Sequence, residues 1–410
     1  MDEARGAAAA ATPAAERGLG IRYSNRPGLA GLVLSNYFLT LVTLSIYRFW
    51  ARTRLRRYFW SNIEIAGEPL EYTGTGRELF IGFLIALAIL APLAVAYMVL
   101  VRLALGNLAA SIALRLVYVV AIIALIQAAH FRARRYRLTR TAWRGIHAGQ
   151  GGSTWRYIGL SFLYSLLMLA TLGLAYPWMD LALARYKMSN TWFGDTRFSL
   201  DGAAGRKLFP YWLLAWALFA VPLVIAYGAN WQIFVEPVRQ GHATPPPHPM
   251  AFLFLLASIL LGIPALIAYW VASLRYVASC TRLGGSRLRS AARIGRVIAI
   301  SVGYYLALVV LTIVVGLILY AVEAGTESAV GMPQASGHLM FAVVVACALV
   351  IFLPASQLLS YCLLRARVLR HLVDTLTLEN PEALASVTQS ARRRQRFGEG
   401  LADSFEIGSF

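Results

Sequence analysis

A short pattern that could bind anions occurs four times along the chain. In each copy an arginine precedes a tyrosine, and a serine or threonine follows four residues after the arginine: Arg57-Tyr58 with Ser61, Arg135-Tyr136 with Thr139, Arg185-Tyr186 with Ser189, and Arg275-Tyr276 with Ser279. A guanidinium group binds phosphate and carboxylate through charged hydrogen bonds. The four arginines are therefore candidate contacts for an anionic solute or an anionic phospholipid headgroup. Simple anchoring of apolar segments at the membrane surface is the plainer interpretation of the same pairs.

Neutral polar side chains form a second candidate site. Asn36, Thr40, Thr43 and Tyr47 recur at the spacing of one helical face, and Ser161 and Ser165 begin a related face further along. Such a stripe either lines a hydrated path or bonds a neighbouring helix, and the second interpretation is favoured. The candidate lining of a substrate path consists of Asn36, Thr40, Thr43, Trp50, Thr171 and Trp178.

Groups suited to catalysis or metal binding are sparse. The six histidines are scattered, and only His242 and His248 lie near each other, without cysteine or carboxylate company. No nucleophile and base are paired at a recognisable spacing, and the glycine turns near Gly74 and Gly202 match no phosphate-binding fingerprint. We therefore predict no enzymatic activity, no metal and no cofactor. Asp180 is the one carboxylate that a broken apolar element could carry into the membrane.

The composition decides which elements must position these residues. The 410 residues are 59% hydrophobic and 14% charged, whereas an average soluble domain has about a quarter charged residues. Eight apolar runs lie at roughly 29–50, 79–101, 108–130, 155–178, 208–235, 250–273, 297–322 and 339–364. The composition thus predicts a polytopic membrane protein and excludes soluble, secreted and disordered classes.

The basic residues predict the orientation. Five segments, 51–78, 131–154, 179–207, 274–296 and 365–410, hold 29 of the 38 lysines and arginines, and only Arg102, Arg115 and Arg239 fall near the other side. Because basic loops stay in the cytoplasm, we predict six transmembrane helices with both termini cytoplasmic. The same rule accounts for the net charge of +19 without a nucleic-acid partner.

The segments 29–50 and 155–178 are flanked by cations at both ends. If these segments were ordinary spans, basic loops would lie on the outer side of the membrane. We therefore expect both segments to enter and leave the bilayer on the cytoplasmic side. Eight ordinary spans are the alternative.

An internal repeat supports treating these two segments alike. Residues 29–80 match residues 157–209 at an offset of 128 that becomes 129 after one inserted residue, for example Thr43 with Thr171 and Leu79-Phe80 with Leu208-Phe209. Trp50 likewise matches Trp178. After each Arg-Tyr pair, alternating residues around a glycine turn predict a short cytoplasmic β-hairpin. The expected fold is an all-α polytopic membrane protein with such hairpins. We expect a disordered cytoplasmic tail over 1–28, one membrane domain over 29–380 and a cytoplasmic tail over 381–410.

Several stretches resemble a known family. Residues 39–50, Glu71–Phe80, Thr171–Trp178 and Cys280–Gly285 are similar to the YjgN-like family of bacterial inner-membrane proteins. The resemblance implies a location in the inner membrane and supplies no activity. Arg48-Phe49-Trp50 departs from the Tyr176-Pro177-Trp178 of the second copy.

Two functions fit these features. A permease- or channel-like protein for a small anionic solute or lipid is the first hypothesis, because duplication and broken elements are typical of transporters. A membrane scaffold or sensor, whose hairpins at 63–72 and 191–201 dock a partner, is the alternative. The lipid bilayer and anionic phospholipid headgroups are the expected partners, and a protein partner is left open.

Overall fold

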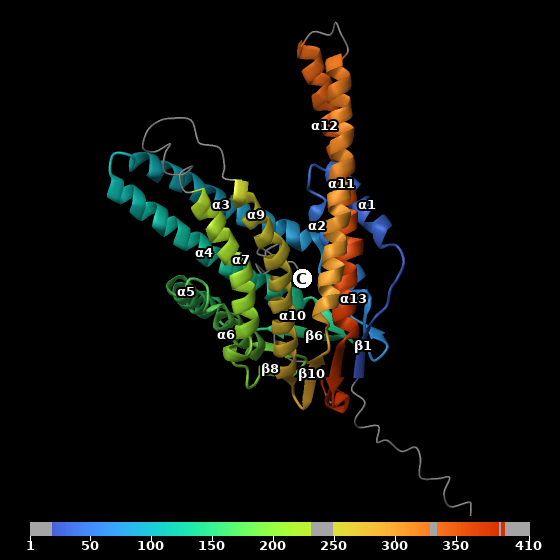
Figure 1. Cartoon of the computed structure of the whole chain (residues 1–410). Helices are drawn as coiled ribbons and strands as arrows, with labels where there is room; N and C mark the ends of the chain where they lie inside the picture. Colours follow the sequence, from blue (N-terminus) through green and yellow to red (C-terminus); the bar gives the residue numbers. More distant parts are fainter. Residues whose placement is uncertain (1–18, 231–248, 329–333, 385–386, 390–410) are drawn as a thin grey trace, which may run out of the picture. The chain divides into compact units, whose positions relative to one another are not determined.

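The computed structural model describes residues 19–230, 249–328, 334–384 and 387–389, and the chain forms two compact units (Figure 1). The first unit consists of residues 1–21, 78–294 and 375–410, and the second of residues 22–77 and 295–374. Each unit is described by itself below.

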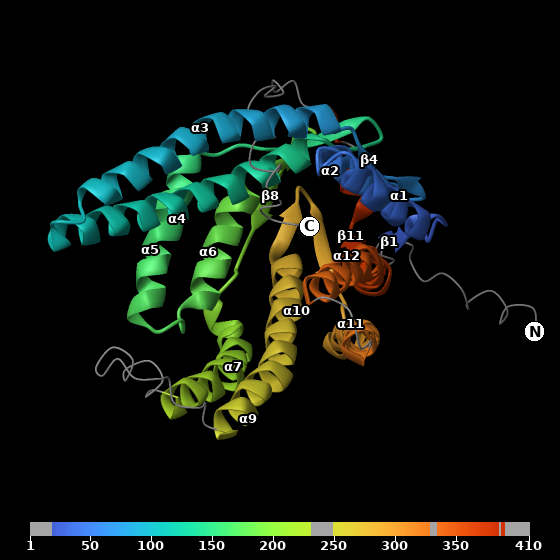
Figure 2. The same ribbon diagram turned by 90° about the horizontal axis from the view of Figure 1, so that it is seen from above.

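The first unit is built from helical hairpins. Its helices are α3 (Gly76–Leu103), α4 (Leu108–Thr139), α5 (Thr154–Ala170), α6 (Tyr176–Ser189), α7 (Phe209–Ala229), α9 (Pro249–Ala257) and α10 (Ile263–Cys280). A π-helical turn, Ser258–Gly262, joins α9 to α10, so that the two form one continuous helix. Seen from above in Figure 2, α3 and α4 make a long hairpin, and the shorter α5 and α6 lie beside each other.

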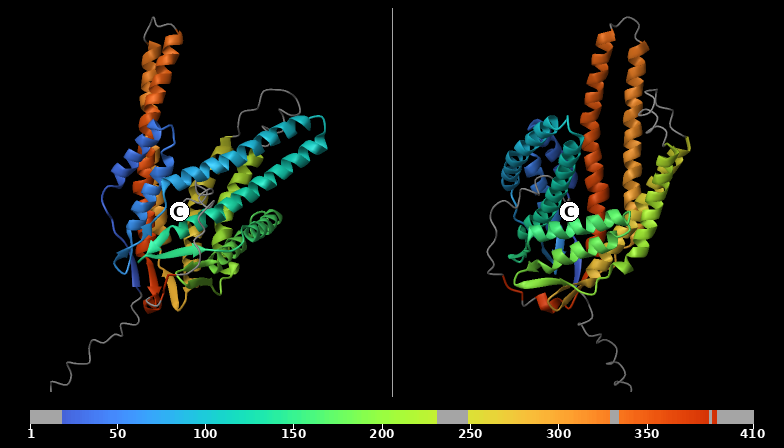
Figure 3. Two further views of the ribbon diagram at one scale, coloured as in Figure 1. Left: turned by 180° about the vertical axis from the view of Figure 1, so that it is seen from behind. Right: turned by 90° about the vertical axis from the view of Figure 1, so that its left-hand side faces the viewer.

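The second unit has one short and one long helical pair. The short pair is α1 (Leu29–Val42) and α2 (Arg48–Ser61), and the long helices are α11 (Ile294–Ser328) and α12 (Gln334–Leu359), which continues through a π-helical turn into α13 (Ala366–Asp374). The two long helices stand out in Figure 3.

Among the described residues, six helices are long and apolar enough to cross a membrane, the number that the sequence predicts. They cover Gly76–Leu103, Leu108–Thr139, Phe209–Ala229, Met250–Cys280, Ile294–Val322 and Ala342–Asp374. Large apolar side chains on them face outward, such as Leu116 at 61% and Leu317 at 62% exposed. Since water would penalise such a surface and lipid would not, the outer face of these helices suits a bilayer.

The all-α expectation was wrong, because the short hairpins join into a sheet. In the first unit the order is β1–β11–β10–β9–β8–β7–β6–β5, with every neighbouring pair antiparallel. The strands are β1 (Leu19–Tyr23), β5 (Thr141–Trp143), β6 (Ile146–Gln150), β7 (Thr191–Phe193), β8 (Thr196–Leu200), β9 (Thr281–Leu283), β10 (Ser286–Ser290) and β11 (Leu376–Glu379). The second unit carries β2 (Ile63–Ile65), β3 (Glu68–Pro69) and β4 (Glu71–Tyr72). Each hairpin was predicted, but the pairing of one hairpin with the next was not.

Both predicted tails contain ordered residues. Strand β1 falls inside the segment 1–28 and pairs through Leu19 and Gly20 with β11. Its alternation buries Ile21 and Tyr23, a pattern that five residues made too short to recognise. At the other end, Val387 is buried and Thr388 bonds the turn between β7 and β8. The tail predictions for 1–18 and 390–410 lie outside the described residues.

Candidate functional site

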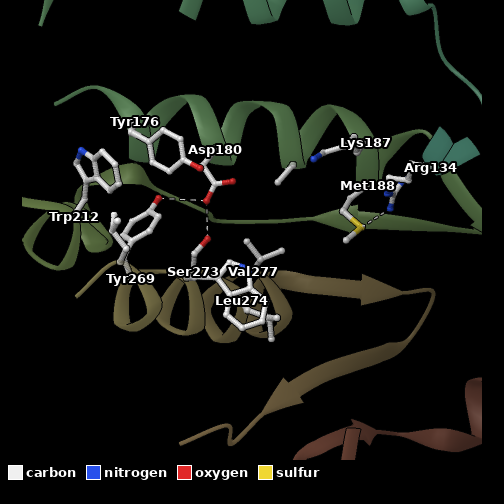
Figure 4. A pocket seen from close by; sticks show the side chains of 13 residues that line it. Arg134, Tyr176, Asp180, Lys187, Met188, Trp212, Tyr269, Ser273, Leu274 and Val277 are labelled. Carbon is white, nitrogen blue, oxygen red and sulfur yellow. Dashed lines mark hydrogen bonds between the residues drawn. The ribbon is translucent and has the colours of Figure 1, made fainter. Parts of the chain in front are cut away.

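A cavity of about 560 Å³ lies in the first unit, among helices that were expected to enclose a path. Helix α6 forms one wall and α10 the other, while α7 and α4 each add one residue (Figure 4). Its lining consists of Arg134, Tyr176, Asp180, Ala184, Lys187, Met188, Trp212, Leu266, Tyr269, Trp270, Ser273, Leu274 and Val277. The cavity therefore lies where a short, non-spanning helix faces two spanning ones.

One end of the cavity is acidic and aromatic. The Asp180 carboxylate accepts hydrogen bonds from the Ser273 hydroxyl at 2.7 Å and from the Tyr269 hydroxyl at 3.3 Å. The rings of Tyr176 and Trp212 stack with centroids 4.4 Å apart, and Tyr269 lies 5.1 Å from Trp212. Asp180 is thus held in a fixed position beside three aromatic rings.

The other end of the cavity is basic. The Arg134 guanidinium donates to the side chains of Gln150 and Thr191, the second at 2.9 Å, so its position is fixed by the sheet. Lys187 lies nearby on α6, and within the described part of the chain its ammonium has no carboxylate partner. Burial lowers the pKa of Lys187, the nearby charge of Arg134 lowers it further, and Asp180 opposes both effects. Two cations therefore face an open volume, and neither forms an ion pair with a described carboxylate.

The turn between α5 and α6 brings Tyr176 and Asp180 to this place. Leu172 and Gly173 adopt left-handed backbone angles with φ of 50° and 92°, and the Thr171 hydroxyl accepts from the Ala175 amide at 3.1 Å. The indole N–H of Trp212 donates to the Gly173 carbonyl, and that of Trp216 donates to the Leu172 carbonyl, both at 2.9 Å. A spanning helix thus satisfies polar backbone atoms that lipid could not satisfy.

The polar side chains of the predicted stripe form hydrogen bonds within the α1–α2 hairpin. Asn36 is buried, donates to the Ala51 carbonyl at 3.3 Å and accepts from Arg54 at 3.1 Å. The Thr40 hydroxyl donates to the Asn36 carbonyl. Thr43 holds the turn between α1 and α2 in the same manner as Thr171 holds the other, accepting from the Tyr47 amide at 2.9 Å. These groups lie in the second unit and have local partners; their role in a substrate path stays a prediction.

The two predicted tryptophans pack on glycines at the entry to the next helix. A Cβ atom on Gly76 would lie 2.6 Å from the Trp50 ring, and one on Gly205 would lie 2.9 Å from the Trp178 ring. Trp178 is 40% exposed and does not line the cavity. Each ring therefore needs glycine opposite it, and the same contact is made in both of the segments that the sequence predicts to be copies of each other.

The candidate arginines make contacts to the backbone. Arg57 donates to the Gly74 carbonyl, Arg135 to the carbonyls of Gly151 and Gly152, and Arg185 to the Ala203 carbonyl, at 2.6 to 3.1 Å. These acceptors follow a β-hairpin and precede the next helix. Arg275 is exposed, and none of the described residues forms a hydrogen bond with it. Binding of an anion by these four residues stays a prediction.

The paired tyrosines close each helical hairpin. Tyr136 donates to the Glu78 carboxylate at the start of α3 at 2.7 Å, and Tyr186 donates to the Ser153 carbonyl before α5 at 2.8 Å. Tyr58 and Tyr276 donate to the carbonyls of Arg26 and Gly202, which precede α1 and α7. Three of the pairs, at Arg57, Arg135 and Arg185, thus join the start of their own hairpin to the start of the next, whereas at Arg275-Tyr276 only the tyrosine makes its contact.

Sequence reasoning named Asp180 but missed Lys187 and the residues across from it. The missed signal is a stripe on one helix: Tyr176, Asp180, Ala184 and Lys187 follow one another at spacings of four, four and three residues. Lys187 is also one of only two lysines among 38 basic residues. No sequence pattern marks Tyr269 and Ser273 as site residues, because their contacts with Asp180 on α6 depend on tertiary packing.

Comparison with known proteins shows which family the sequence matches. The sequence model of a family described as "Bacterial protein of unknown function (DUF898)" matches residues 25–404. The "Inner membrane protein YjgN" of Salmonella typhimurium is 40% identical over 58 residues, which cover 14% of this chain and 15% of that protein. No solved structure matches the chain.

Proposed function

Since the chain belongs to the bacterial DUF898 family and is an integral inner-membrane protein, we propose that it binds a phosphate-bearing amphiphile from the cytoplasmic leaflet. The cavity between α6, α7 and α10 is the binding site. The observation that carries this proposal is the pair of cations, Lys187 and Arg134, which face the cavity while apolar residues complete its wall. Basic pockets between membrane helices bind phospholipid headgroups in this way.

The depth of the cavity supports a lipid as ligand. Helices α1 and α5 have 14 and 17 residues, or about 21 Å and 26 Å, which is short of the ~30 Å hydrocarbon layer. The turns that follow them carry exposed apolar side chains, with Leu44 at 88% and Leu172 at 76% exposed. We infer that both helical pairs are half-inserted hairpins whose apolar tips dip into lipid.

The charge distribution supports entry of the ligand from the cytoplasmic side. The hairpins begin and end next to basic segments, and such segments stay in the cytoplasm. The cavity then opens at the depth of the cytoplasmic headgroups, with both termini on the same side. Movement of the bound amphiphile or a small anion across the membrane, as in a permease, is the extension of this proposal.

A scaffold role gains less support at one of its two predicted surfaces. At the hairpin 191–201, the Asp195 carboxylate accepts from the Thr388 hydroxyl at 3.1 Å, and the Asp195 amide donates to the Thr388 carbonyl at 3.0 Å. The turn of this hairpin is therefore covered by the chain itself.

The test replaces Lys187 and asks whether lipid is retained. The purified protein is reconstituted into nanodiscs that contain phosphatidylglycerol and phosphatidylethanolamine. A mass spectrometer then releases the protein from the nanodisc, and the lipids that stay bound to it are counted. We expect Lys187→Met to lose about tenfold in lipid affinity, since a charged hydrogen bond is worth about 1.5–3 kcal/mol. Lys207→Met is the matched control, because Lys207 lies outside the cavity lining. Equal loss in both variants, or in neither, would contradict the proposal.

A further inference from the structure

The cavity carries opposite charges at its two ends, and this polarity restricts what it can bind. Asp180 lies at the aromatic end, and Lys187 and Arg134 lie at the basic end (Figure 4). In the described part of the chain, neither Asp180 nor Lys187 forms an ion pair. A single anion would match the basic end and leave the Asp180 carboxylate without a counter-charge.

The spacing of the two charges on α6 fits a short zwitterion. Asp180 and Lys187 are seven residues apart on one continuous helix, which corresponds to about 10.5 Å along the axis at ~1.5 Å per residue. The two side chains therefore lie two helical turns apart on the same face of α6. A phosphate and an amine joined through a two-carbon linker form a ligand short enough to lie between them.

The acidic end distinguishes a primary from a quaternary ammonium. Three oxygen-bearing groups meet there: the Asp180 carboxylate, the Tyr269 hydroxyl and the Ser273 hydroxyl. After each hydroxyl has donated to Asp180, its oxygen still has lone pairs to accept with. A primary ammonium has three N–H donors for these acceptors, whereas a quaternary ammonium has none.

The remaining wall is suited to an acyl chain. Leu266, Leu274 and Val277 line the cavity on α10, and Trp270 beside them is 46% exposed on a spanning helix. A ligand with its headgroup between Asp180 and Lys187 would place its apolar part along this side. A free, water-soluble headgroup would leave that surface uncovered.

From these features we propose that the ligand is a zwitterionic aminophospholipid of the phosphatidylethanolamine class, with its phosphate at Lys187 and Arg134 and its primary ammonium at Asp180. This inference rests on the proposed function and specifies its ligand.

The experiment compares three headgroups on one protein. The wild-type chain is reconstituted into nanodiscs that contain equal amounts of phosphatidylethanolamine, phosphatidylcholine and phosphatidylglycerol, and the retained lipids are counted by native mass spectrometry. We expect phosphatidylethanolamine to be retained several-fold over the other two. Asp180→Asn should abolish this preference, because the amide that replaces the carboxylate carries no charge to pair with the ammonium. Asp201→Asn is the matched control, because Asp201 pairs with Arg282 outside the cavity lining.

The outcomes separate this inference from the proposed function. Equal retention of phosphatidylcholine and phosphatidylethanolamine, or a preference that survives Asp180→Asn, would overturn the ammonium assignment. If lipid retention still depended on Lys187, the phosphate site would stand; if no lipid were retained, both proposals would fail. If glycerophosphoethanolamine at an equal concentration displaced the bound lipid, the ligand would be a free headgroup and the assignment to a lipid would be overturned. The melting temperature of each variant shows whether it is folded.

Discussion

At the scale of single residues, Lys187 is the group on which the proposed binding depends most. The Asp180 carboxylate is held by two hydroxyl groups, and Arg134 is held by the sheet, so both have structural as well as functional roles. Lys187 has no such anchoring partner among the described residues. Its substitution is therefore the cleanest way to change the charge of the cavity without disturbing the fold.

The titration of Lys187 should respond to ligand. Burial, and the charge of Arg134, lower the pKa of Lys187, so the amine loses its charge at a lower pH than an ordinary lysine. Anion binding should be present at neutral pH and weaken as pH rises through this lowered pKa. A bound phosphate favours the charged form and raises the pKa again. Amine-selective labelling of Lys187 over a pH series should begin at a higher pH when lipid is bound than when it is absent. Identical labelling curves with and without lipid would contradict the assignment.

A second residue-scale prediction concerns the glycine opposite Trp178. A Cβ atom on Gly205 would lie 2.9 Å from the ring, so Gly205→Ala forces a shift that we expect to cost about 1–3 kcal/mol. Gly159→Ala is the control, because a Cβ atom there meets nothing within 4 Å and its helix should gain about 0.5–1 kcal/mol. Thermal unfolding followed by tryptophan fluorescence measures the midpoint temperature of each variant. We expect this temperature to fall for Gly205→Ala only. A lowered midpoint in both would show that the close approach is not the cause.

At the scale of elements, the α5–α6 pair is supported by the spanning helix α7. Trp216 donates to the Leu172 carbonyl, and Trp216→Phe removes this bond while keeping a ring of similar shape. We expect the turn to lose about 0.6–1 kcal/mol of stability against local opening. This loss should be seen as faster amide hydrogen exchange in residues 167–176. Trp155→Phe is the control, since Trp155 is 80% exposed at the start of α5. Unchanged exchange in both variants would mean that α7 does not hold the turn.

The elements also show what the sequence could and could not predict. Runs of more than twenty apolar residues made the six spans recognisable, and alternation around Gly67 and Gly194 made the hairpins recognisable. The sheet was missed because its pairings join distant strands of three to five residues, such as β10 with β11. The meeting of Asp180 with Ser273 depends on packing across 93 positions of sequence. No local pattern records such a contact.

At the scale of the whole molecule, the account predicts a cavity that faces the cytoplasmic leaflet. This follows from the basic segments beside the half-inserted hairpins and from the apolar tips of those hairpins. The Lys187 and Asp180 proposals both require this orientation, because a headgroup must reach the cavity from the leaflet on that side. The topology of α5 and α6 is therefore the central claim.

Thiol labelling of single cysteines in intact cells tests this claim most directly, in a chain whose Cys280, Cys347 and Cys362 have been replaced. Gly106 and Arg197 are exposed positions between α3 and α4 and on β8, and Leu172 lies at the tip of the α5–α6 turn. We predict that an impermeant reagent labels Gly106→Cys only. Arg197→Cys should react after the membrane is opened, and Leu172→Cys should react with a lipid-soluble reagent alone. Labelling of Leu172→Cys or Arg197→Cys from outside would contradict the account, because α5 would then cross the membrane and the cavity could not face the cytoplasmic leaflet.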